Sequence, residues 1–165
     1  MNQLDPMSVM QKAMKRIEKG AFLTVSFLDE INIMTIGWAM FGIVWQKPIL
    51  MVAIRSTRYT YTLIEKINNF TVSVPAGGME KELTFCGTRS GRNCDKLQKC
   101  NLEAIDGRVV ESPILKLDGI HFECRIVFKT AMEPVNLVFT YEKHYPKKDY
   151  HTLYFGEILD CYDMP

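Results

Sequence analysis

Basic and hydroxyl-bearing side chains cluster at one point of the chain, between an apolar run at 49–54 and a short helical pattern at 61–67. The cluster consists of Arg55, Ser56, Thr57, Arg58, Tyr59 and Thr60. Guanidinium groups, hydroxyls and the free backbone N–H groups of a helix start can hold an anion through charge, dipole and hydrogen bonds. The cluster therefore predicts an anion site. An exposed basic cap is the alternative interpretation.

Two further segments carry more polar detail than a packed sheet needs. The loop at 90–96 contains Ser90, Gly91, Arg92 and Lys96, where glycine lets a ligand approach the backbone and the cations add charge. The strand-like segment at 32–38 contains Asn32, Met34, Thr35, Gly37 and Trp38. These residues could contact a ligand. Alternatively, the first segment is a solvated loop and the second is a sheet face with satisfied polar groups.

The chain offers few catalytic groups of its own. It has no G-x-S-x-G motif, and none of its three histidines has an obvious nucleophile partner or metal-ligand spacing. The five cysteines include no C-x-x-C, so we expect neither a metal site nor a catalytic dithiol. Cys94 and Cys100 lie close enough in sequence to be considered as a redox pair, but small, buried or half-buried residues are the favoured interpretation. This pattern fits a site in which a bound cofactor supplies the chemistry, with no catalytic residue from the chain.

Composition excludes several classes of function. The chain has 165 residues with 20 basic and 19 acidic side chains, a net charge of +1, so no long-range field favours nucleic acid or an anionic membrane. The longest stretch without formal charge, 31–46, is shorter than the roughly 20 apolar residues that span a bilayer. Charged residues crowd the first twenty positions, which does not fit a secretory signal. We expect a cytoplasmic protein.

The residues of these candidate sites need elements to position them. Apolar residues at three- and four-residue steps predict an amphipathic helix at about 7–19, started by Asp5-Pro6 and ended by Gly20. Short helices are predicted at 61–67, 80–85 and 94–99. Strands are predicted at 21–28, 31–42, 49–54, 70–74, 102–110, 121–130, 136–141 and 153–161. Hairpin connections dominate and no βαβ alternation is visible, so the expected fold is a mainly β, antiparallel barrel with a few short helices.

The order of these segments resembles the flavin reductase-like, FMN-binding split-barrel family, and especially its flavoredoxin-like branch. The resemblance extends from about Leu23 to Ile158. It rests on Asn32-Ile-Met-Thr35 with Trp38, on Trp45-x-x-Pro48, on Val-Ala-Ile-Arg55 continuing to Thr60, on Phe70-Thr-Val-Ser-Val-Pro75, on Gly87-x-x-Ser90-Gly91-Arg92-Asn93-x-Asp95-Lys96, and on Tyr154-x-Gly156-Glu157-Ile158. Each motif alone is weak, but six in the same order are specific.

The resemblance implies a single domain over 1–165, with the helix at about 7–19 and a Greek-key-like split barrel at about 21–162. It also implies a homodimer that binds FMN without a covalent bond near the subunit interface. By this analogy Asn32, Met34 and Thr35 line the isoalloxazine edge and Trp38 is a wall. Arg55, Ser56, Arg58, Tyr59 and Thr60 hold the phosphate, Ser90, Gly91, Arg92 and Lys96 close over the flavin, and His151 and Tyr154 lie near the site by position only.

Two functions follow from the resemblance. The first is an oxidoreductase that takes hydride from NADH or NADPH through bound FMN and passes electrons to free flavin or to a protein acceptor. The alternative is a flavoredoxin-type FMN electron carrier with little intrinsic NAD(P)H activity, reduced by a protein donor. A flavin- or haem-binding module, or a barrel that serves another substrate, is a less favoured interpretation.

Overall fold

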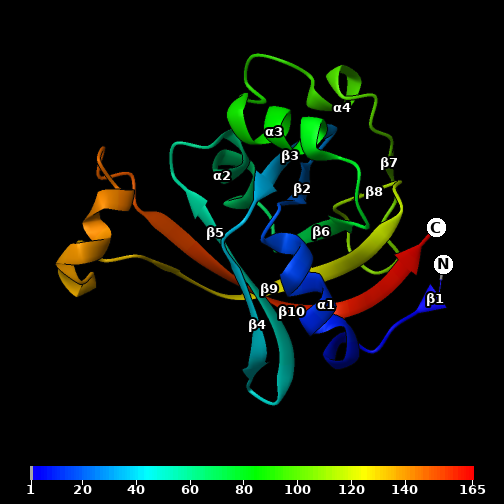
Figure 1. The fold of residues 1–165 in the computed structure, drawn as a ribbon, viewed down its shortest axis with the longest axis horizontal. Coiled ribbons are helices and arrows are strands. Elements are labelled where there is room, and N and C mark those ends of the chain that lie inside the picture. Colours follow the sequence, from blue (N-terminus) through cyan, green and yellow to red (C-terminus); the bar gives the residue numbers. More distant parts are fainter. Residues whose placement is uncertain (1) are drawn as a thin grey trace.

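A computed structural model describes residues 2–165, and its main feature is one large, strongly bent antiparallel sheet (Figure 1). The helices are α1 (Pro6–Ile17), α2 (Tyr59–Ile64), α3 (Glu80–Thr88), α4 (Lys96–Lys99) and the 3-10 helices η1 (Pro134–Asn136) and η2 (Phe139–His144). The strands are β1 (Asn2–Gln3), β2 (Ala21–Phe27), β3 (Glu30–Ile36), β4 (Ala39–Val44), β5 (Lys47–Arg55), β6 (Asn69–Pro75), β7 (Ala104–Ile105), β8 (Ile114–Leu115), β9 (Gly119–Ala131) and β10 (His151–Met164).

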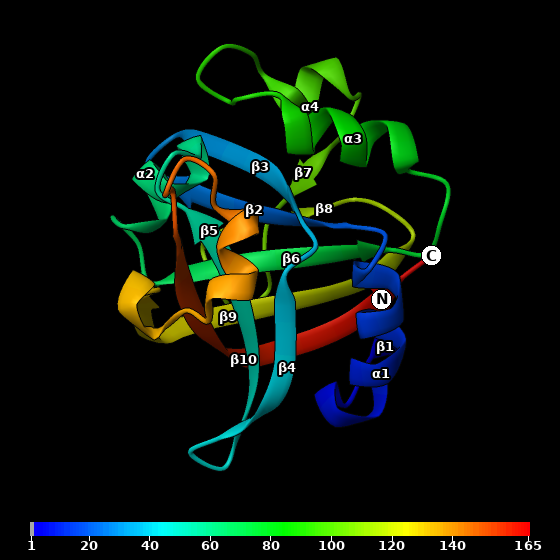
Figure 2. The ribbon, with the colours of Figure 1, turned by 60° about the vertical axis from the view of Figure 1, so that its left-hand side comes forward.

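The order of the strands explains why the sheet is bent. The strands run β3-β2-β6-β9-β10-β5-β4, so β3 and β4 are the two ends of the sheet. Only Gly37 and Trp38 separate these two strands in the chain, so the sheet must curl until its ends meet at that point. Figure 2 shows the chain passing from β3 directly into β4. The sheet does not close by hydrogen bonding between β3 and β4, so the fold is a split barrel, as the sequence predicted.

One predicted strand is two strands in the structure. The prediction of a continuous strand at 31–42 is wrong, because β3 ends at Ile36 and β4 begins at Ala39. The apolar pattern continues through the break, and only Gly37 marks the bend. The interruption leaves the carbonyl of Trp38 free to accept a hydrogen bond from the backbone N–H of Ala53, at 3.2 Å. This hydrogen bond holds the bend between β3 and β4 against β5.

Helix α1 forms where the spacing predicted it. Asp5 is the N-cap, its carboxylate accepts from the backbone N–H of Ser8, and Pro6 occupies the first turn. The helix buries Val9, Ala13 and Ile17 against the sheet, whereas Met7 remains half-exposed. The main core lies between α1 and the inner faces of β2, β5, β6, β9 and β10. The core is tightly filled: a Cβ atom on Gly156 would lie 2.6 Å from the ring of Phe70.

The predicted strand at 136–141 is also wrong. This segment forms η1 and η2, which project from the sheet between β9 and β10 as an arm, residues 132–150 (Figure 1). Pro134 begins η1 and cannot donate a ladder hydrogen bond. Val135, Val138 and Phe139 are exposed, and none of the strands within residues 2–165 pairs with them. Alternating apolar residues predict a strand only where a partner strand is present.

The predicted strand at 102–110 is reduced to β7, which pairs with β8. The rest of that segment is a loop tied to the buried carboxylate of Glu123, which accepts from the backbone N–H groups of Arg108, Val109 and Val110. Within residues 2–165, no helix combines the length and the apolar character that crossing a membrane requires.

Candidate functional site

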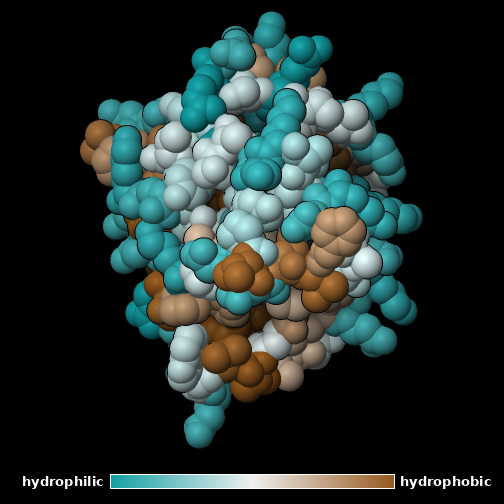
Figure 3. Space-filling model, turned by 90° about the vertical axis from the view of Figure 1, so that its left-hand side faces the viewer, coloured by the Kyte–Doolittle hydropathy of each residue, from teal (hydrophilic) through white to brown (hydrophobic). Residues whose placement is uncertain are grey.

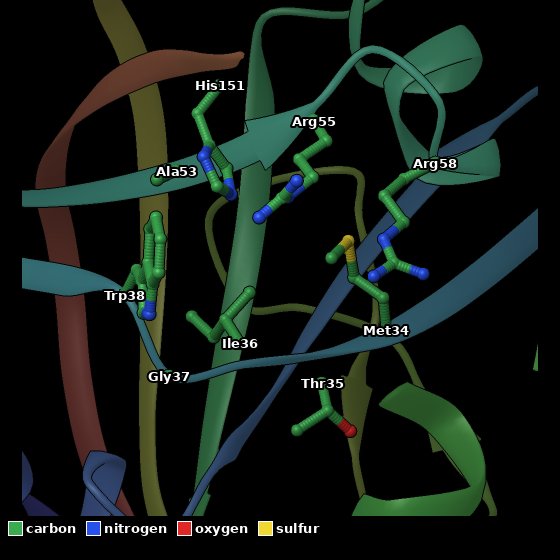
Figure 4. A pocket seen from close by; sticks show the side chains of 9 residues that line it. All are labelled: Met34, Thr35, Ile36, Gly37, Trp38, Ala53, Arg55, Arg58 and His151. Carbon is green, nitrogen blue, oxygen red and sulfur yellow. The ribbon is translucent and has the colours of Figure 1, made fainter. Parts of the chain in front are cut away.

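A cavity of about 250 Å³ opens where the two ends of the sheet meet (Figure 4). Strands β3, β5 and β10 and the loop before α2 contribute its walls. The lining residues are Met34, Thr35, Ile36, Gly37, Trp38, Ala53, Arg55, Arg58 and His151. Apolar side chains and cations therefore face the same space, a combination suited to a planar apolar group that carries an anion.

Arg55 is held in place by the protein. Its guanidinium forms an ion pair with Asp149 at 2.6 Å and donates to the backbone carbonyl of His144 at 2.9 Å. Its central carbon also lies 5.0 Å from the ring centroid of Tyr145 and 6.0 Å from that of Trp38. Three of these four partners come from the arm. Arg55 therefore anchors the arm to the cavity wall and has a fixed position there.

His151 lies beside Arg55, its partner in the β5–β10 ladder, and is neutral. Its ring is tilted against Trp38 with centroids 4.6 Å apart, and its Nδ1 shares a 2.8 Å hydrogen bond with the hydroxyl of Tyr145. Burial, followed by the positive charge of Arg55, lowers the pKa of His151 to about 4. Near neutral pH this imidazole can accept or donate a hydrogen bond without adding charge to the cavity.

Arg58 differs from Arg55 in having no fixed partner. It is exposed, and among residues 2–165 its guanidinium takes part in no ion pair or side-chain hydrogen bond. In Figure 4 the side chain leaves the loop before α2 and reaches toward β3, where Met34 lies. Arg58 also lines a smaller cavity of about 50 Å³ that adjoins the first one. This arginine is available to bind an anion.

The smaller cavity brings together most of the remaining predicted residues. It is lined by Asn32, Met34, Thr57, Arg58, Tyr59, Thr60, Cys86, Gly87, Arg89, Ser90, Gly91 and Lys96. The side-chain amide of Asn32 donates to the hydroxyl of Thr60 at 2.7 Å, and both residues are buried. A Cβ atom at Gly91 would lie 2.0 Å from Oδ1 of Asn32, so glycine is needed for the loop to approach β3 this closely.

The polar groups of Lys96 and Thr35 form hydrogen bonds within the protein, so they are not free to bind a ligand. The buried ammonium of Lys96 donates to the carbonyls of Ile33 at 2.8 Å and Cys86 at 2.9 Å. The hydroxyl of Thr35 donates to the carbonyl of Leu83 at 2.6 Å, and Figure 4 shows this side chain pointing away from the others. Lys96 thus fastens the 90–96 loop to β3, while Thr35 fastens α3 to β3.

Ser56 and Arg92 line neither cavity. Ser56 lies exposed in the turn before α2. The guanidinium of Arg92 lies 5.1 Å above the ring of Tyr59 and donates to the carbonyl of Thr57 at 3.3 Å. The hydroxyl of Tyr59 in turn donates to Glu30, and this hydrogen bond raises the pKa of Tyr59. These contacts join the loop at 90–96 to the loop at 55–60.

Sequence reasoning missed part of the site. Ile36 and Ala53 line the larger cavity, but their sequence pattern is that of ordinary strand residues. Tyr145 and Asp149 were missed because they reach the site only through the arm, by their contacts with Arg55, which is far away in the chain. The one local signal was the density of aromatic residues at 139–150. Tyr154 was expected near the site only by its position in the sequence. In the structure its hydroxyl donates a 2.7 Å hydrogen bond to the carboxylate of Glu65.

The bent antiparallel sheet and its cavity define the class of protein: a split barrel like those of flavin reductase-like proteins. Residues 14–163 match the model of the flavin reductase like domain, so the chain belongs to that family. An uncharacterized protein of Archaeoglobus fulgidus is 32% identical over 138 residues, which are 84% of this chain and 68% of that protein. A relative in Pyrococcus abyssi is 30% identical and covers 79% of this chain, which spans 65% of its length.

Solved structures agree with this assignment. The flavoredoxin of Methanosarcina acetivorans superposes with a TM-score of 0.69 and 26% identity, covering 88% of this chain and 68% of its own. The flavoredoxin of Desulfovibrio vulgaris (Miyazaki F) superposes with a TM-score of 0.70 and 25% identity, and the match covers 88% of this chain and 69% of that flavoredoxin. The NADH:FAD oxidoreductase of Streptomyces globisporus C-1027 shares the fold, with a TM-score of 0.69 and 18% identity. The match covers 100% of this chain and 88% of that oxidoreductase.

Proposed function

We propose that this protein binds FMN without a covalent bond in the two adjoining cavities and acts as an oxidoreductase. The observation that carries the proposal is the convergence of three distant segments, at 32–38, 55–60 and 90–96, around Arg58, whose guanidinium forms no ion pair or side-chain hydrogen bond with residues 2–165. Family membership and the similarity to flavoredoxins support it. The family model alone does not distinguish FMN from another flavin. Two exposed arginines, Arg58 and Arg89, line the smaller cavity and form no ion pair or side-chain hydrogen bond among residues 2–165, so this cavity suits a terminal phosphate.

The residues present fit FMN. Met34, Ile36, Trp38 and Ala53 supply apolar surface for a flat ring. A phosphate carries close to two negative charges, and Arg58 beside the smaller cavity supplies a free guanidinium for it. We assign Arg58 to the phosphate and the backbone around Ser90 and Gly91 to the chain that joins phosphate and ring. Arg55 and Lys96 contribute positive potential from fixed positions.

The chain's own residues orient the cofactor and set its electrostatics. FMN, when bound, supplies the hydride-accepting and electron-donating chemistry. Arg55 keeps a positive charge at the cavity wall, which stabilises negative charge that develops beside it. His151 stays neutral and packs against Trp38, so this part of the wall adds no charge to the cavity. No side chain needs to act as a general acid or base.

We further propose NADH or NADPH as the electron donor and free flavin or a protein as the acceptor. The NADH:FAD oxidoreductase fold supports this path. The alternative, an electron carrier with little NAD(P)H activity, is favoured by a different observation: the two flavoredoxins are 25% and 26% identical to this chain, against 18% for the oxidoreductase. The two functions share the same site and differ in their donor.

Two measurements test the proposal. The purified protein should show flavin absorption, and the chromophore released by heat or acid should be FMN. A colourless protein that gains no flavin spectrum when FMN is added would refute the cofactor assignment. Steady-state oxidation of NADH and NADPH by the holoprotein, with and without added flavin, then separates the functions. Negligible turnover with both donors, in protein that retains FMN, would favour the carrier.

We also propose a homodimer, from apolar side chains left exposed on one face. Met40, Ile43 and Trp45 on the β4–β5 hairpin and Phe128, Val135 and Phe139 on or near the arm are all exposed. Figure 3 shows apolar surface gathered on the side of the molecule that bears the arm. An exposed apolar face of this kind is stabilised by burial against a partner. Sedimentation or light scattering of the FMN-bound protein should give twice the chain mass, and a monomer mass would contradict the proposal.

A further inference from the structure

Two cysteines that are distant in sequence are in contact beside the candidate site. The Sγ atoms of Cys86, in α3, and Cys100, at the C-cap of α4, are 3.8 Å apart. Sequence spacing raised Cys94 as a possible partner of Cys100, although small, buried or half-buried residues were the favoured interpretation. In the structure the thiol of Cys94 faces the carbonyl of Ser90, at 3.6 Å. The cysteine in contact with Cys100 is therefore Cys86.

The surroundings of this pair fix both sulfurs. Cys86 is buried in a small apolar cluster with Phe22, Leu83 and Leu115, and Cys100 packs against the same cluster while half-exposed. The ammonium of Lys96 donates to the carbonyl of Cys86, and the backbone N–H of Cys100 donates to the carbonyl of Lys96. One lysine thus ties both cysteine backbones together. A disulfide needs the two sulfurs, now 3.8 Å apart, to approach to about 2.05 Å.

We propose that Cys86 and Cys100 form a reversible intramolecular disulfide by exchange with a low-molecular-weight disulfide. The half-exposed thiol of Cys100 meets the reagent first. Its sulfur bonds to one reagent sulfur, the reagent's S–S bond breaks, and the first leaving thiolate takes the proton given up by Cys100. The sulfur of Cys86 then attacks the sulfur of Cys100, displaces the second thiolate and loses its proton to it. The dithiol gives up two electrons and the reagent becomes two thiols.

Burial is consistent with the order of these steps. It raises the pKa of Cys86 to about 12 and also raises the pKa of Cys100, so both thiols are protonated near neutral pH and each reacts through a small thiolate fraction. The positive charge of Lys96 acts in the opposite direction on both cysteines and favours each thiolate as it forms. Because Cys86 is buried and Cys100 is half-exposed, a reagent in solution meets Cys100 first, and Cys86 then attacks the disulfide formed on its neighbour.

The crosslink would close the segment 87–99 into a loop. That segment includes Ser90, Gly91 and Lys96, so the oxidation state of the pair would control how freely the loop moves over the smaller cavity. Constraining the unfolded chain also raises the thermal unfolding midpoint. The further expectation that oxidation slows the release of FMN rests on the proposed function. Formation of the disulfide and the rise in midpoint do not.

The experiment treats the holoprotein with oxidised glutathione, removes the reagent, denatures the chain and counts its thiols. We expect two of the five thiols to be lost and to return with a reductant. Mass spectrometry should show the loss of two hydrogen atoms and a peptide that joins Cys86 to Cys100. The matched control Cys94→Ser should form the same crosslink, whereas Cys100→Ser should form none. Cys86→Ala provides a second loss-of-crosslink variant in which the buried position stays apolar.

Three results would overturn the proposal. The first is an unchanged thiol count in oxidised protein, and the second is a crosslink that maps to Cys94. The third is a glutathione adduct that stays on Cys100 without being displaced by Cys86. Thiol counting and mass spectrometry of the denatured chain detect all three results, and neither measurement depends on bound flavin. A protein that forms the crosslink but binds no FMN would therefore refute the proposed function and leave this inference intact.

Discussion

Arg55 and Arg58 lie three residues apart and line the same cavity, yet their charges have different uses. Arg55 is paired with Asp149, bonded to the carbonyl of His144 and packed beside two aromatic rings. Arg58 has no such partner within residues 2–165. A cation that the protein itself satisfies belongs to the scaffold and sets the local field. A cation that it leaves free is available to a ligand, so the comparison assigns support to Arg55 and binding to Arg58.

The largest expected effect is the pH dependence of the unfolding free energy that comes from His151, the neighbour of Arg55 in the cavity wall. His151 has a pKa of about 4 in the folded chain, against about 6.5 when unfolded, so between these values the unfolded chain binds more protons. Its contribution to stability is therefore complete above about pH 6.5 and is lost as the pH falls toward 4. The loss of unfolding free energy over this pH range is about 3 kcal/mol. Urea unfolding from pH 7 to pH 4 measures it.

The control for this measurement is His151→Gln. The pKa of the buried His121 is also lowered by burial, and this group titrates in both proteins, so the difference between the two curves isolates His151. We expect the variant to show a flatter dependence of unfolding free energy on pH. Parallel curves for variant and parent would mean that His151 is solvated and is not a fixed wall of the cavity.

The next effect tests whether Arg55 belongs to the scaffold. Arg55→Ala leaves Asp149 unpaired and detaches the arm, and we expect a loss of about 2–3 kcal/mol because the pair is largely but not fully removed from water. Arg58→Ala should change the unfolding free energy of flavin-free protein by only about 0.5 kcal/mol or less. Chemical denaturation of both variants measures the contrast. Equal losses would remove the distinction between the two arginines.

The third effect tests whether Arg58 binds the phosphate. A charge-assisted hydrogen bond contributes about 1.5–3 kcal/mol, so Arg58→Ala should weaken FMN binding by about ten- to a hundredfold. Riboflavin lacks the phosphate and should bind the variant and the parent equally. The loss for FMN should shrink as salt rises. Titration of flavin-free protein with both flavins, at two ionic strengths, measures this.

Two outcomes would move the phosphate elsewhere. Equal losses for FMN and riboflavin would mean that Arg58 contacts the ring, and no loss for either would mean that it is only an exposed cap. The loop at 90–96 would then be the next place to test. Gly91→Ala is the sharpest variant there, because its Cβ would displace the buried Asn32 from its hydrogen bond with Thr60.

The same comparison shows what the sequence could predict. Local patterns identified the capped helix α1, the hairpin β2–β3 and the strand ending at Arg55, because their apolar spacing and turn residues act over a few positions. The motif order identified the split barrel and most of the residues around Arg58. The bend at Gly37 and the arm could not be predicted, because both depend on which strands end up side by side. Arg55 looked like Arg58 in the sequence, and only Asp149, far along the chain, distinguishes them.

The smallest expected effect concerns the cysteines, which lie on the Arg58 side of the site. Cys94→Ser combined with Cys100→Ser should leave flavin reduction nearly unchanged under reducing conditions, because bound flavin carries the electrons and neither sulfur belongs to the residues assigned to it. Serine is close to cysteine in size and both positions are half-exposed, so the fold should tolerate the change. Reduction rates and flavin content of the double variant, compared with the parent, provide the measurement. If the rate fell while FMN content stayed normal, a cysteine would take part in electron transfer, and the pair beside Lys96 would have to be counted as part of the site.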